Sequence, residues 1–266
     1  MTALTAPQRA SWITQTAEVT RRWSVDSLRA PWGLGVAIIQ PVIWLLLFGN
    51  VFSSVATVPG FGSSDYMTFL VPGILMMTVL YSGAWAGTGF IDDITSGVMD
   101  RMLTSPVSRS SLVAGQLVQQ LGICFVQGLC VLAIGSLAGA SYAGGVLGMA
   151  VALGASLLLA AAFCSLSAAV ALLARDQTAL IGISTIIVLP ATFLSTALMP
   201  AALLPSWVQT VAQYNPLTWA VQIARTAMSP SVDWAVVGTR TALLLALAAL
   251  VSLWSVRAMR TYQDSL

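Results

Sequence analysis

ATFLSTALMPAALLPSWVQTVAQYNPLTWAVQIAR, the segment at residues 191–225, decides how this chain sits in a membrane. It starts inside an apolar run, is interrupted at Pro200, and is interrupted again at Asn215 and Pro216. Each apolar piece between the breaks is shorter than the roughly 20 residues that a helix needs to cross a bilayer. Short pieces are tolerated at membrane depth only where protein or water satisfies their backbone. The pattern therefore predicts a re-entrant block at residues 200–230.

Two short helices are expected within this block, one near residues 205–213 and the other near residues 217–228. They would dip into the outer leaflet and return to the same side. Because proline cannot continue a helix, the break falls at the proline between them. We expect Trp219 to lie at the membrane interface. Arg225 is expected to satisfy main-chain carbonyl groups where the two helices turn.

Composition places the whole chain in a membrane. Of its 266 residues, 58% are hydrophobic and 8% are charged, whereas soluble domains average about 25% charged residues. The net charge of +2 is too small to suggest nucleic-acid binding. We therefore expect one all-α integral membrane domain that covers residues 1–266 and lies in a lipid bilayer.

The chain lacks the residue types on which much enzyme chemistry depends. Histidine is absent, which removes the commonest general base and metal ligand. The three cysteines lie inside apolar runs, without the spacing of a disulfide framework or a metal site. Lysine is also absent, so the chain contains no phosphate-binding loop ending in Gly-Lys-Ser/Thr. We expect no cofactor on this chain, and any ATP that drives it is hydrolysed by another chain.

Six apolar stretches are long enough to cross roughly 30 Å of hydrocarbon. They lie at about residues 33–52, 68–90, 112–137, 145–173, 179–199 and 235–256. Nine arginines fall on one side of a six-span arrangement, namely Arg9, Arg21, Arg22, Arg29, Arg101, Arg109, Arg175, Arg257 and Arg260. Only Arg225 and Arg240 fall towards the other side. Because arginine-rich loops stay in the cytoplasm, this pattern places both termini there.

An amphipathic helix is expected before the first span, at residues 8–29. Trp12 and Trp23 lie on its apolar face, and Glu18 and Arg22 lie on its polar face. Two interpretations are compatible with this pattern. The helix lies on the membrane surface and stabilises the first span, or it binds a cytoplasmic partner, and it can do both.

The loop at residues 91–110 joins the second and third spans. Its first part, residues 91–104, shows helical spacing of apolar side chains and predicts a short helix parallel to the membrane. Asp93 and Asp100 are expected on the polar face of this helix. The helix ends before Pro106, which disfavours helical geometry at the preceding residue. A push on such a helix would move both neighbouring spans.

Polar and aromatic side chains inside the spans are candidates for a pathway through the membrane. Four glutamines of the third span share one face, namely Gln116, Gln119, Gln120 and Gln127. Polar groups in lipid face protein or water, so these amides either bond to neighbouring helices or line a cytoplasmic vestibule. Few interior aromatic residues are expected, with two tryptophans foremost. The candidate pathway residues are Gln40, Trp44, Trp85, Gln116, Gln120 and Thr192.

Two motifs of the chain resemble those of one family of membrane proteins. Residues 97–109 read GVMDRMLTSPVSR, and residues 215–219 read NPLTW, with Arg225 following. Both resemble the signatures of the type-2 ABC exporter permeases, a family that includes daunorubicin-resistance-like drug and lipid exporters and the polysaccharide exporters. Two positions depart from the family pattern. Trp219 replaces the usual tyrosine or histidine, and residues 94–96 (Ile-Thr-Ser) replace an acidic–basic–acidic triplet.

The resemblance implies an assembly. Two six-span permease subunits, identical or similar, would form the transport unit in the plasma membrane. Two copies of a separate ABC ATPase subunit would dock beneath them and bind ATP and Mg. The loop helix would be the coupling helix that enters a groove of the ATPase. The implied contact residues are Asp93, Gly97, Asp100, Arg101, Pro106 and Arg109.

The re-entrant motif would cap the exit of the pathway. Its residues are Pro200, Asn215, Pro216, Trp219 and Arg225. The expected cargo is an amphiphilic drug or lipid that moves outward from the cytoplasm or the inner leaflet. A polysaccharide exporter of the same family is the main alternative, although it would be expected to display stacked aromatic residues along its pathway.

Two other classes of protein are disfavoured by the same residues. An ion-coupled secondary transporter usually needs ionisable groups within its spans, and the middle of each predicted span lacks Asp, Glu, Lys and His. A membrane-embedded enzyme would need His, Cys–His or carboxylate pairs in register. The one adjacent pair of acids, Asp92 and Asp93, falls in the cytoplasmic loop.

Overall fold

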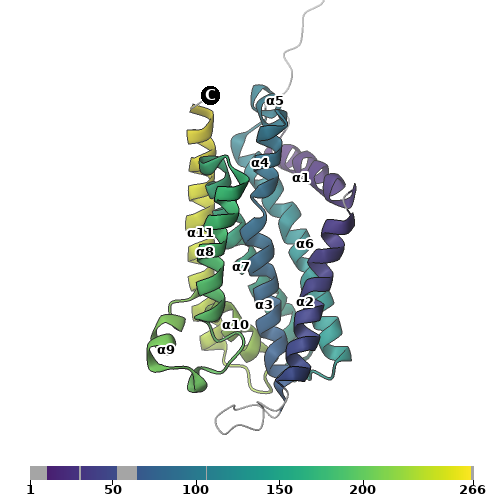
Figure 1. The fold of residues 1–266 in the computed structure, drawn as a ribbon, viewed down its shortest axis with the longest axis vertical. Helices are drawn as coiled ribbons and strands as arrows, with labels where there is room; N and C mark the ends of the chain where they lie inside the picture. Colours follow the sequence, from purple (N-terminus) through teal and green to yellow (C-terminus); the bar gives the residue numbers. More distant parts are fainter. Residues whose placement is uncertain (1–10, 30, 53–64, 106, 265–266) are drawn as a thin grey trace, which may run out of the picture.

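Helices make up nearly all of the chain in the computed structural model, which describes residues 11–29, 31–52, 65–105 and 107–264 (Figure 1). A helix satisfies its own backbone hydrogen bonds, as lipid requires, so this build suits an apolar sequence. In chain order the elements are α1 (Trp12–Arg29), α2 (Pro31–Val51), α3 (Tyr66–Trp85), α4 (Thr88–Thr95), α5 (Val98–Thr104), α6 (Arg109–Leu137), α7 (Gly145–Ala174), α8 (Gln177–Phe193), the 3-10 turn η2 (Ala201–Leu203), α9 (Ser206–Ala212), α10 (Pro216–Met228) and α11 (Trp234–Asp264).

Within the described part of the chain, four helical stretches are long and apolar enough to cross a membrane. They are Tyr66–Thr95, Arg109–Leu137, Gly145–Ala174 and Trp234–Gln263. Two shorter apolar stretches, Gly35–Val51 and Gln177–Phe193, accompany them. The protein is therefore a multi-pass membrane protein, as its composition predicts.

The central helix is α7, which packs against α3, α6, α8, α10 and α11. Small residues allow this close packing between helices. The approach is tightest at the start of α7, where a Cβ atom on Gly144 or Gly148 would lie 2.0 or 2.3 Å from the main-chain oxygen of Ala227. A larger side chain at either glycine would displace α10 from α7.

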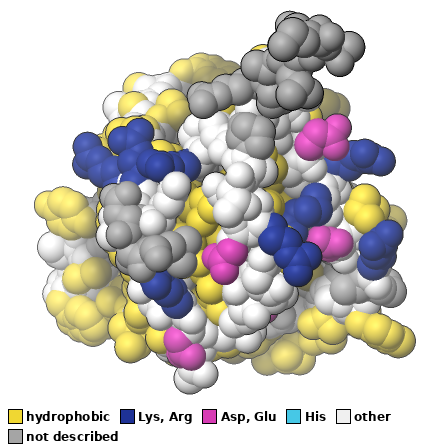
Figure 2. Space-filling model, turned by 90° about the horizontal axis from the view of Figure 1, so that it is seen from above, with side chains coloured by type: hydrophobic (Ala, Val, Ile, Leu, Met, Phe, Trp, Pro, Cys, Tyr) yellow, Lys and Arg dark blue, Asp and Glu magenta, His cyan; other side chains and the backbone are white. Residues whose placement is uncertain are grey.

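The two ends of the bundle differ in charge. α1, α4, α5 and the C-terminal end of α11 lie at one end, and α9 and α10 lie at the other (Figure 1). Figure 2 looks onto the first end and shows arginine and acidic side chains spread over it. Arg9 of the predicted arginine-rich side lies outside the described residues. Arg225 and Arg240 belong to α10 and to the early turns of α11, towards the opposite end.

The N-terminal helix α1 packs on α6 of its own chain. Val19 is buried there, and its side chain would meet a Cβ atom placed on Gly115 of α6 at 2.5 Å. Trp12 Nε1 donates to Ser110 Oγ at 3.0 Å, and Thr20 Oγ1 donates to the main-chain oxygen of Gly115 at 3.1 Å. The predicted amphipathic helix is thus present, and part of its apolar face covers the start of α6.

Candidate functional site

A cavity of about 770 Å³ lies between α2, α3 and α6. Residues of α1 and α4 line it at the arginine-rich end, and the end of α8 with Leu198 lines it at the other. All six predicted pathway residues are in its wall, namely Gln40, Trp44, Trp85, Gln116, Gln120 and Thr192. Helices far apart in sequence therefore bring these side chains around one space.

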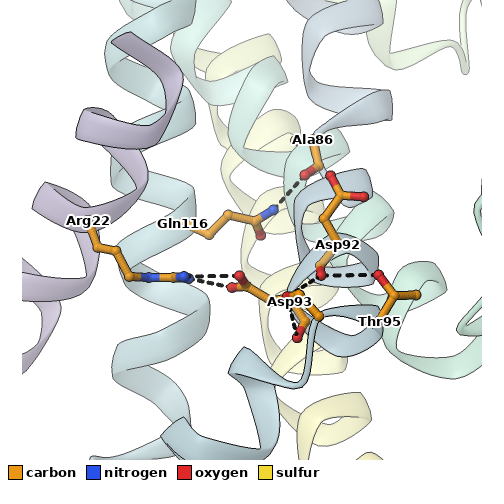
Figure 3. A network of polar contacts seen from close by, with 7 residues as sticks. Arg22, Ala86, Asp92, Asp93, Thr95 and Gln116 are labelled. Atoms are coloured by element: carbon orange, nitrogen blue, oxygen red, sulfur yellow. Dashed lines mark hydrogen bonds and ion pairs between the residues drawn. The ribbon is translucent and has the colours of Figure 1, made fainter. Parts of the chain in front are cut away.

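The glutamines of α6 combine the two roles that the sequence left open. Gln116 Nε2 donates to the main-chain oxygen of Ala86 at 2.6 Å (Figure 3), and Gln127 Nε2 donates to that of Ala37 at 3.1 Å. Gln120 Nε2 donates to Ser82 Oγ at 2.7 Å. Each glutamine thus ties α6 to a neighbouring segment and also forms part of the cavity wall.

The expectation of few interior aromatic residues is wrong. Six aromatic side chains line the cavity, namely Trp23, Trp44, Phe48, Tyr81, Trp85 and Phe193. They form close pairs, since the rings of Trp44 and Phe48 lie 4.9 Å apart and those of Tyr81 and Trp85 lie 6.0 Å apart. The sequence missed Trp23, Phe48, Tyr81 and Phe193. Phe48 and Tyr81 lie on α2 and α3, which are apolar on every side, so no periodicity marks the face that lines a cavity.

The loop between α3 and α6 contains two helices where one was expected. The predicted helix at residues 91–104 is broken at Gly97, which has a φ of 70° in the left-handed region. Glycine adopts this conformation at little cost, so the chain turns there between α4 and α5. The break changes which side chains face the protein, because a single helical wheel no longer applies. Met99, for example, is fully buried.

Asp93 does not lie on an exposed polar face, in contrast to the expectation from the wheel. It is buried, and both of its carboxylate oxygens accept hydrogen bonds from the guanidinium group of Arg22 on α1 (Figure 3). The hydrogen bond to Asp93 is the largest cause that raises the pKa of Arg22 above its ordinary value. The pair joins α4 to α1, so Asp93 connects two elements at the arginine-rich end.

The remaining predicted coupling residues are more accessible. Asp100 and Arg101 are exposed on α5, and Arg109 is half-buried at the start of α6. Ser108 begins α6 as its N-cap, with its hydroxyl oxygen accepting from the main-chain nitrogen of Ser111 at 3.3 Å. Pro106 lies outside the described residues. The structure therefore leaves α5, rather than Asp93, available to a partner at this end.

At the opposite end, the two short helices of the predicted block are present as α9 and α10. Pro200 is the N-cap of η2 and Asn215 is the N-cap of α10, with Pro216 in the first turn. Asn215 Nδ2 also donates to the main-chain oxygens of Ala191 at 2.7 Å and Leu194 at 2.9 Å. Asn215 thereby holds the end of α8 against the start of α10.

The helix of the fifth predicted span, at residues 179–199, ends earlier than predicted. α8 ends at Phe193, and the main chain beyond it is irregular. Side chains of α10 bind the carbonyl groups that the helix leaves free, which is how irregular backbone is tolerated at membrane depth. Pro190 lies in the last turn of α8 and weakens its continuation.

Arg225 binds carbonyl groups as predicted, but not at the turn between α9 and α10. Its guanidinium nitrogens donate to the main-chain oxygens of Thr196 at 2.6 Å, Ala197 at 2.8 Å and Phe69 at 3.2 and 3.3 Å. The guanidinium carbon also lies 3.5 Å from the ring centroid of Phe69. Arg225 therefore joins α10, the segment after α8 and the start of α3. The turn itself is spanned by Trp219, whose Nε1 donates to the main-chain oxygen of Gln213 at 2.7 Å.

Comparison with known proteins identifies the family of this chain. The sequence model of the ABC-2 type transporter family matches residues 14–229. The chain belongs to the ABC-2 type transporter family. This ABC-2 permease is 28% identical over 263 residues to the daunorubicin resistance ABC transporter permease protein DrrB1 of Streptomyces coeruleorubidus, covering 97% of this chain and 89% of that protein.

Two further relatives match a smaller share of this chain. The "Putative transport permease ycf38" of Pyropia yezoensis is 29% identical over 211 residues, which cover 77% of this chain and 70% of that protein. The "Probable doxorubicin resistance ABC transporter permease protein DrrC" of Mycobacterium tuberculosis is 22% identical over 216 residues, which cover 81% and 76%.

Family membership determines what kind of subunit this is. An ABC-2 permease is a transmembrane subunit without ATPase activity, and it works with an ATPase subunit as its partner. The ion-coupled transporter and the membrane enzyme are thereby set aside as functions of the chain. The family assignment agrees with the resemblance of the two sequence motifs.

Proposed function

We propose that this ABC-2 permease moves an amphiphilic drug or lipid outward from the cytoplasm or the inner leaflet, powered by ATP hydrolysis on its partner. The single observation that carries this proposal is the cavity between α2, α3 and α6. Its volume of about 770 Å³ falls in the range of roughly 300–1,000 Å³ that is typical of drug-sized ligands. Its wall combines aromatic and aliphatic side chains with a few amides, as an amphiphile requires.

The position of the cavity supports transport rather than storage. Its lining runs from Asp92 on α4, at the arginine-rich end, to Thr192 at the end of α8 and to Leu198 beyond it. An amphiphile that enters near α4 would thus reach the block of α9 and α10 along one continuous wall. The names of the daunorubicin and doxorubicin resistance relatives agree with this class of cargo.

The proposed topology has six spans, formed by α2, α3 with α4, α6, α7, α8 and α11, in the plasma membrane. Both termini and the arginine-rich end would face the cytoplasm, because arginine-rich segments are retained there. α9 and α10 would form the re-entrant block in the outer leaflet. Cysteines at Ser206 and Ser229 would then react with impermeant reagents from outside the cell only.

The proposed complex holds two permease subunits, identical or similar, and two ATPase subunits. ATP and Mg would bind the ATPase alone, and this chain would bind no cofactor of its own. The permease pair would place two cavities side by side in the bilayer. Measuring the mass of the purified complex in detergent tests this stoichiometry.

A polysaccharide exporter permease of the same family is the second candidate. The six aromatic side chains of the cavity favour it, because sugar rings stack on aromatic faces. Against it stand the aliphatic parts of the wall, such as Ile74, Met77 and Ile123, which offer no partner to sugar hydroxyl groups. Transport of a fluorescent amphiphile without any effect of added polysaccharide precursor would separate the two candidates.

The proposed function is tested by reconstitution of the permease with its ATPase. Inside-out proteoliposomes should accumulate a fluorescent amphiphile when ATP and Mg are added outside. Omission of ATP, or replacement of the ATPase by a hydrolysis-deficient variant, should abolish accumulation. Equal accumulation with and without ATP would contradict the proposal.

The coupling proposal concerns α5, where Asp100 and Arg101 are exposed. We expect the substitution Asp100→Arg to leave the spans folded, because the site lies outside them. Reversal of a charge that meets the ATPase should lower ATP-driven transport about tenfold or more. Transport per ATP hydrolysed in proteoliposomes is the measurement.

The matched control for this variant is Glu18→Arg, which reverses a charge on the exposed face of α1. Cysteines at positions 100 and 101 should also cross-link to the ATPase. Full transport by Asp100→Arg, together with no cross-link in an intact complex, would refute the placement of α5 against the ATPase.

A further inference from the structure

The charge that the described residues bring to the cavity wall is of one sign, negative. Among the described residues that line it, Asp92 is the one with a charged side chain, and no arginine is among them. The neighbouring basic group, that of Arg22, is already bound by both carboxylate oxygens of Asp93. An anion in the cavity would therefore meet a carboxylate and no free cation. A cation would meet a carboxylate that it can pair with.

The carboxylate of Asp92 is available to pair with a cation. The hydroxyl groups of Thr95 and Ser96 donate to its main-chain oxygen, at 3.1 and 2.7 Å, and leave its carboxylate oxygens unused. Figure 3 shows the Asp92 side chain extended back along α4 towards Ala86, at the junction with α3. Among the described residues, the carboxylate of Asp92 has no hydrogen-bond partner. Asp92 is exposed, in contrast to the buried Asp93.

The amides of the wall are oriented to accept hydrogen bonds. The main-chain oxygens of Ala86 and Ala37 can only accept, so the amide groups that reach them from Gln116 and Gln127 must be the NH₂ ends. This orientation leaves Oε1 of each glutamine as the unused atom. Both oxygens are buried without a partner in the described chain, as is Thr192 Oγ1. All three residues belong to the cavity wall.

Buried acceptors of this kind usually have a partner in the working protein. A ligand that supplies N–H or O–H groups would satisfy them, after a small rotation of the amides. A ligand that carries only acceptors could accept from the Thr192 hydroxyl group but would leave both amide oxygens without a partner. The wall also offers the faces of Trp23, Trp44 and Trp85, and tryptophan is the aromatic side chain that attracts cations most strongly.

We infer that the cavity selects aromatic amphiphiles that carry a positively charged, N–H-donating group, and that Asp92 is the residue that determines this preference. Anionic lipids and anionic drugs are disfavoured by the same carboxylate. This inference rests on the proposed function, because it assumes that cargo occupies the cavity. It goes further in naming the charge and the hydrogen-bonding character of that cargo.

The test uses four dansyl probes with the same alkyl linker, which end in a primary ammonium, a trimethylammonium, a methyl group or a carboxylate. The full-length permease is prepared with its ATPase in phosphatidylcholine nanodiscs, and binding is read as energy transfer from tryptophan to dansyl. Empty nanodiscs correct for partition into lipid. The ammonium probe should bind more tightly than the carboxylate probe, by about fivefold or more. The trimethylammonium probe should fall between them, because it has charge but no N–H group.

The deciding variant is Asp92→Asn, which keeps the shape of the side chain and removes its charge. It should lower the affinity for the ammonium probe about fivefold and leave the affinity for the uncharged probe unchanged, which also shows that the cavity is intact. The matched control is Glu18→Gln. It removes one charge from an exposed ion pair with Arg21 on α1, outside the cavity, and should change neither affinity.

The outcomes separate the two proposals. Equal binding of the ammonium and carboxylate probes, or no effect of Asp92→Asn, would overturn the charge selectivity and leave the cavity as a binding site. Failure of all four probes to bind the unaltered complex would contradict both the selectivity and the proposed use of the cavity.

Discussion

Replacement of Arg225 by methionine should destabilise the permease more than any other single substitution considered for the end of the bundle that holds α9 and α10. The side chain donates hydrogen bonds to three main-chain oxygens, those of Phe69, Thr196 and Ala197. Methionine keeps the bulk of the side chain but leaves these carbonyl groups without a donor. Since each unsatisfied buried group costs about 1–3 kcal/mol, we expect a loss of roughly 3–5 kcal/mol.

The loss should appear as a fall in the thermal unfolding midpoint on the order of 10 °C for the purified protein. Export should fall with it, because the segment after α8 and the block of α9 and α10 would lose their common connection. The matched control is Arg240→Met, which removes a half-buried arginine from the early part of α11. If both variants unfold at the same temperature as the unaltered protein, the structural role assigned to Arg225 is wrong.

The second large effect is expected at the ion pair between Arg22 and Asp93. Asp93→Ala removes the partner of an Arg22 side chain that is 31% exposed, and Arg22 Nε already lacks a hydrogen-bond partner in the described chain. Breaking a buried pair by removing one member leaves an uncompensated charge, which is more costly than losing both members. We expect Asp93→Ala to cost about 2–4 kcal/mol of stability.

A double variant distinguishes this mechanism from general disruption. Arg22→Met combined with Asp93→Leu replaces the pair by apolar side chains, which can restore much of the stability. Thermal unfolding of the two single variants and the double variant gives the coupling energy directly. Additive losses in the double variant would show that the two side chains do not stabilise the protein as a pair.

The same variants report on coupling to the ATPase. Because the pair joins α4 to α1, the double variant should recover stability but not the charge-assisted connection between the two helices. Transport per ATP would then stay below that of the unaltered complex.

Local signals made parts of the fold predictable from the sequence. Pro216 and Asn215 act on their own backbone, through a missing N–H group and a capping side chain, and they placed α9 and α10 close to their observed bounds. The amphipathic pattern before the first span likewise predicted α1. In each case the determining groups lie within a few residues of the element that they define.

Long-range pairings were not predictable in this way. Asp93 was assigned to an exposed face because its partner, Arg22, lies 71 residues away in sequence. Because the helix breaks at Gly97, the side chains of α5 do not continue the single helical wheel that was assumed for residues 91–104. The end of α8 at Phe193 depends on side chains of α10, which a hydropathy pattern cannot reveal.

The cavity was predictable only in part. Glutamines on one face of a span stand out against apolar neighbours, so Gln116 and Gln120 were found from sequence. Tyr81, Phe48 and Phe193 do not stand out, since apolar residues surround them on every side of their helices. Trp23 was assigned to a surface helix, and only the packing of α1 brings it to the mouth of the cavity.

One measurement tests the use of the cavity most directly. A cysteine is placed at Gln40, an exposed residue of the cavity wall, in a variant in which Cys124, Cys130 and Cys164 are replaced by serine or alanine. A bulky maleimide attached at this position fills part of the cavity. A cysteine at Gln177, exposed at the start of α8 and outside the cavity, carries the same label as the control.

We predict that labelling at position 40 abolishes most ATP-dependent export in proteoliposomes, while the complex with the ATPase stays intact and labelling at position 177 has no effect. Full export by the protein labelled at position 40 would contradict the proposal that the cargo passes through the cavity between α2, α3 and α6.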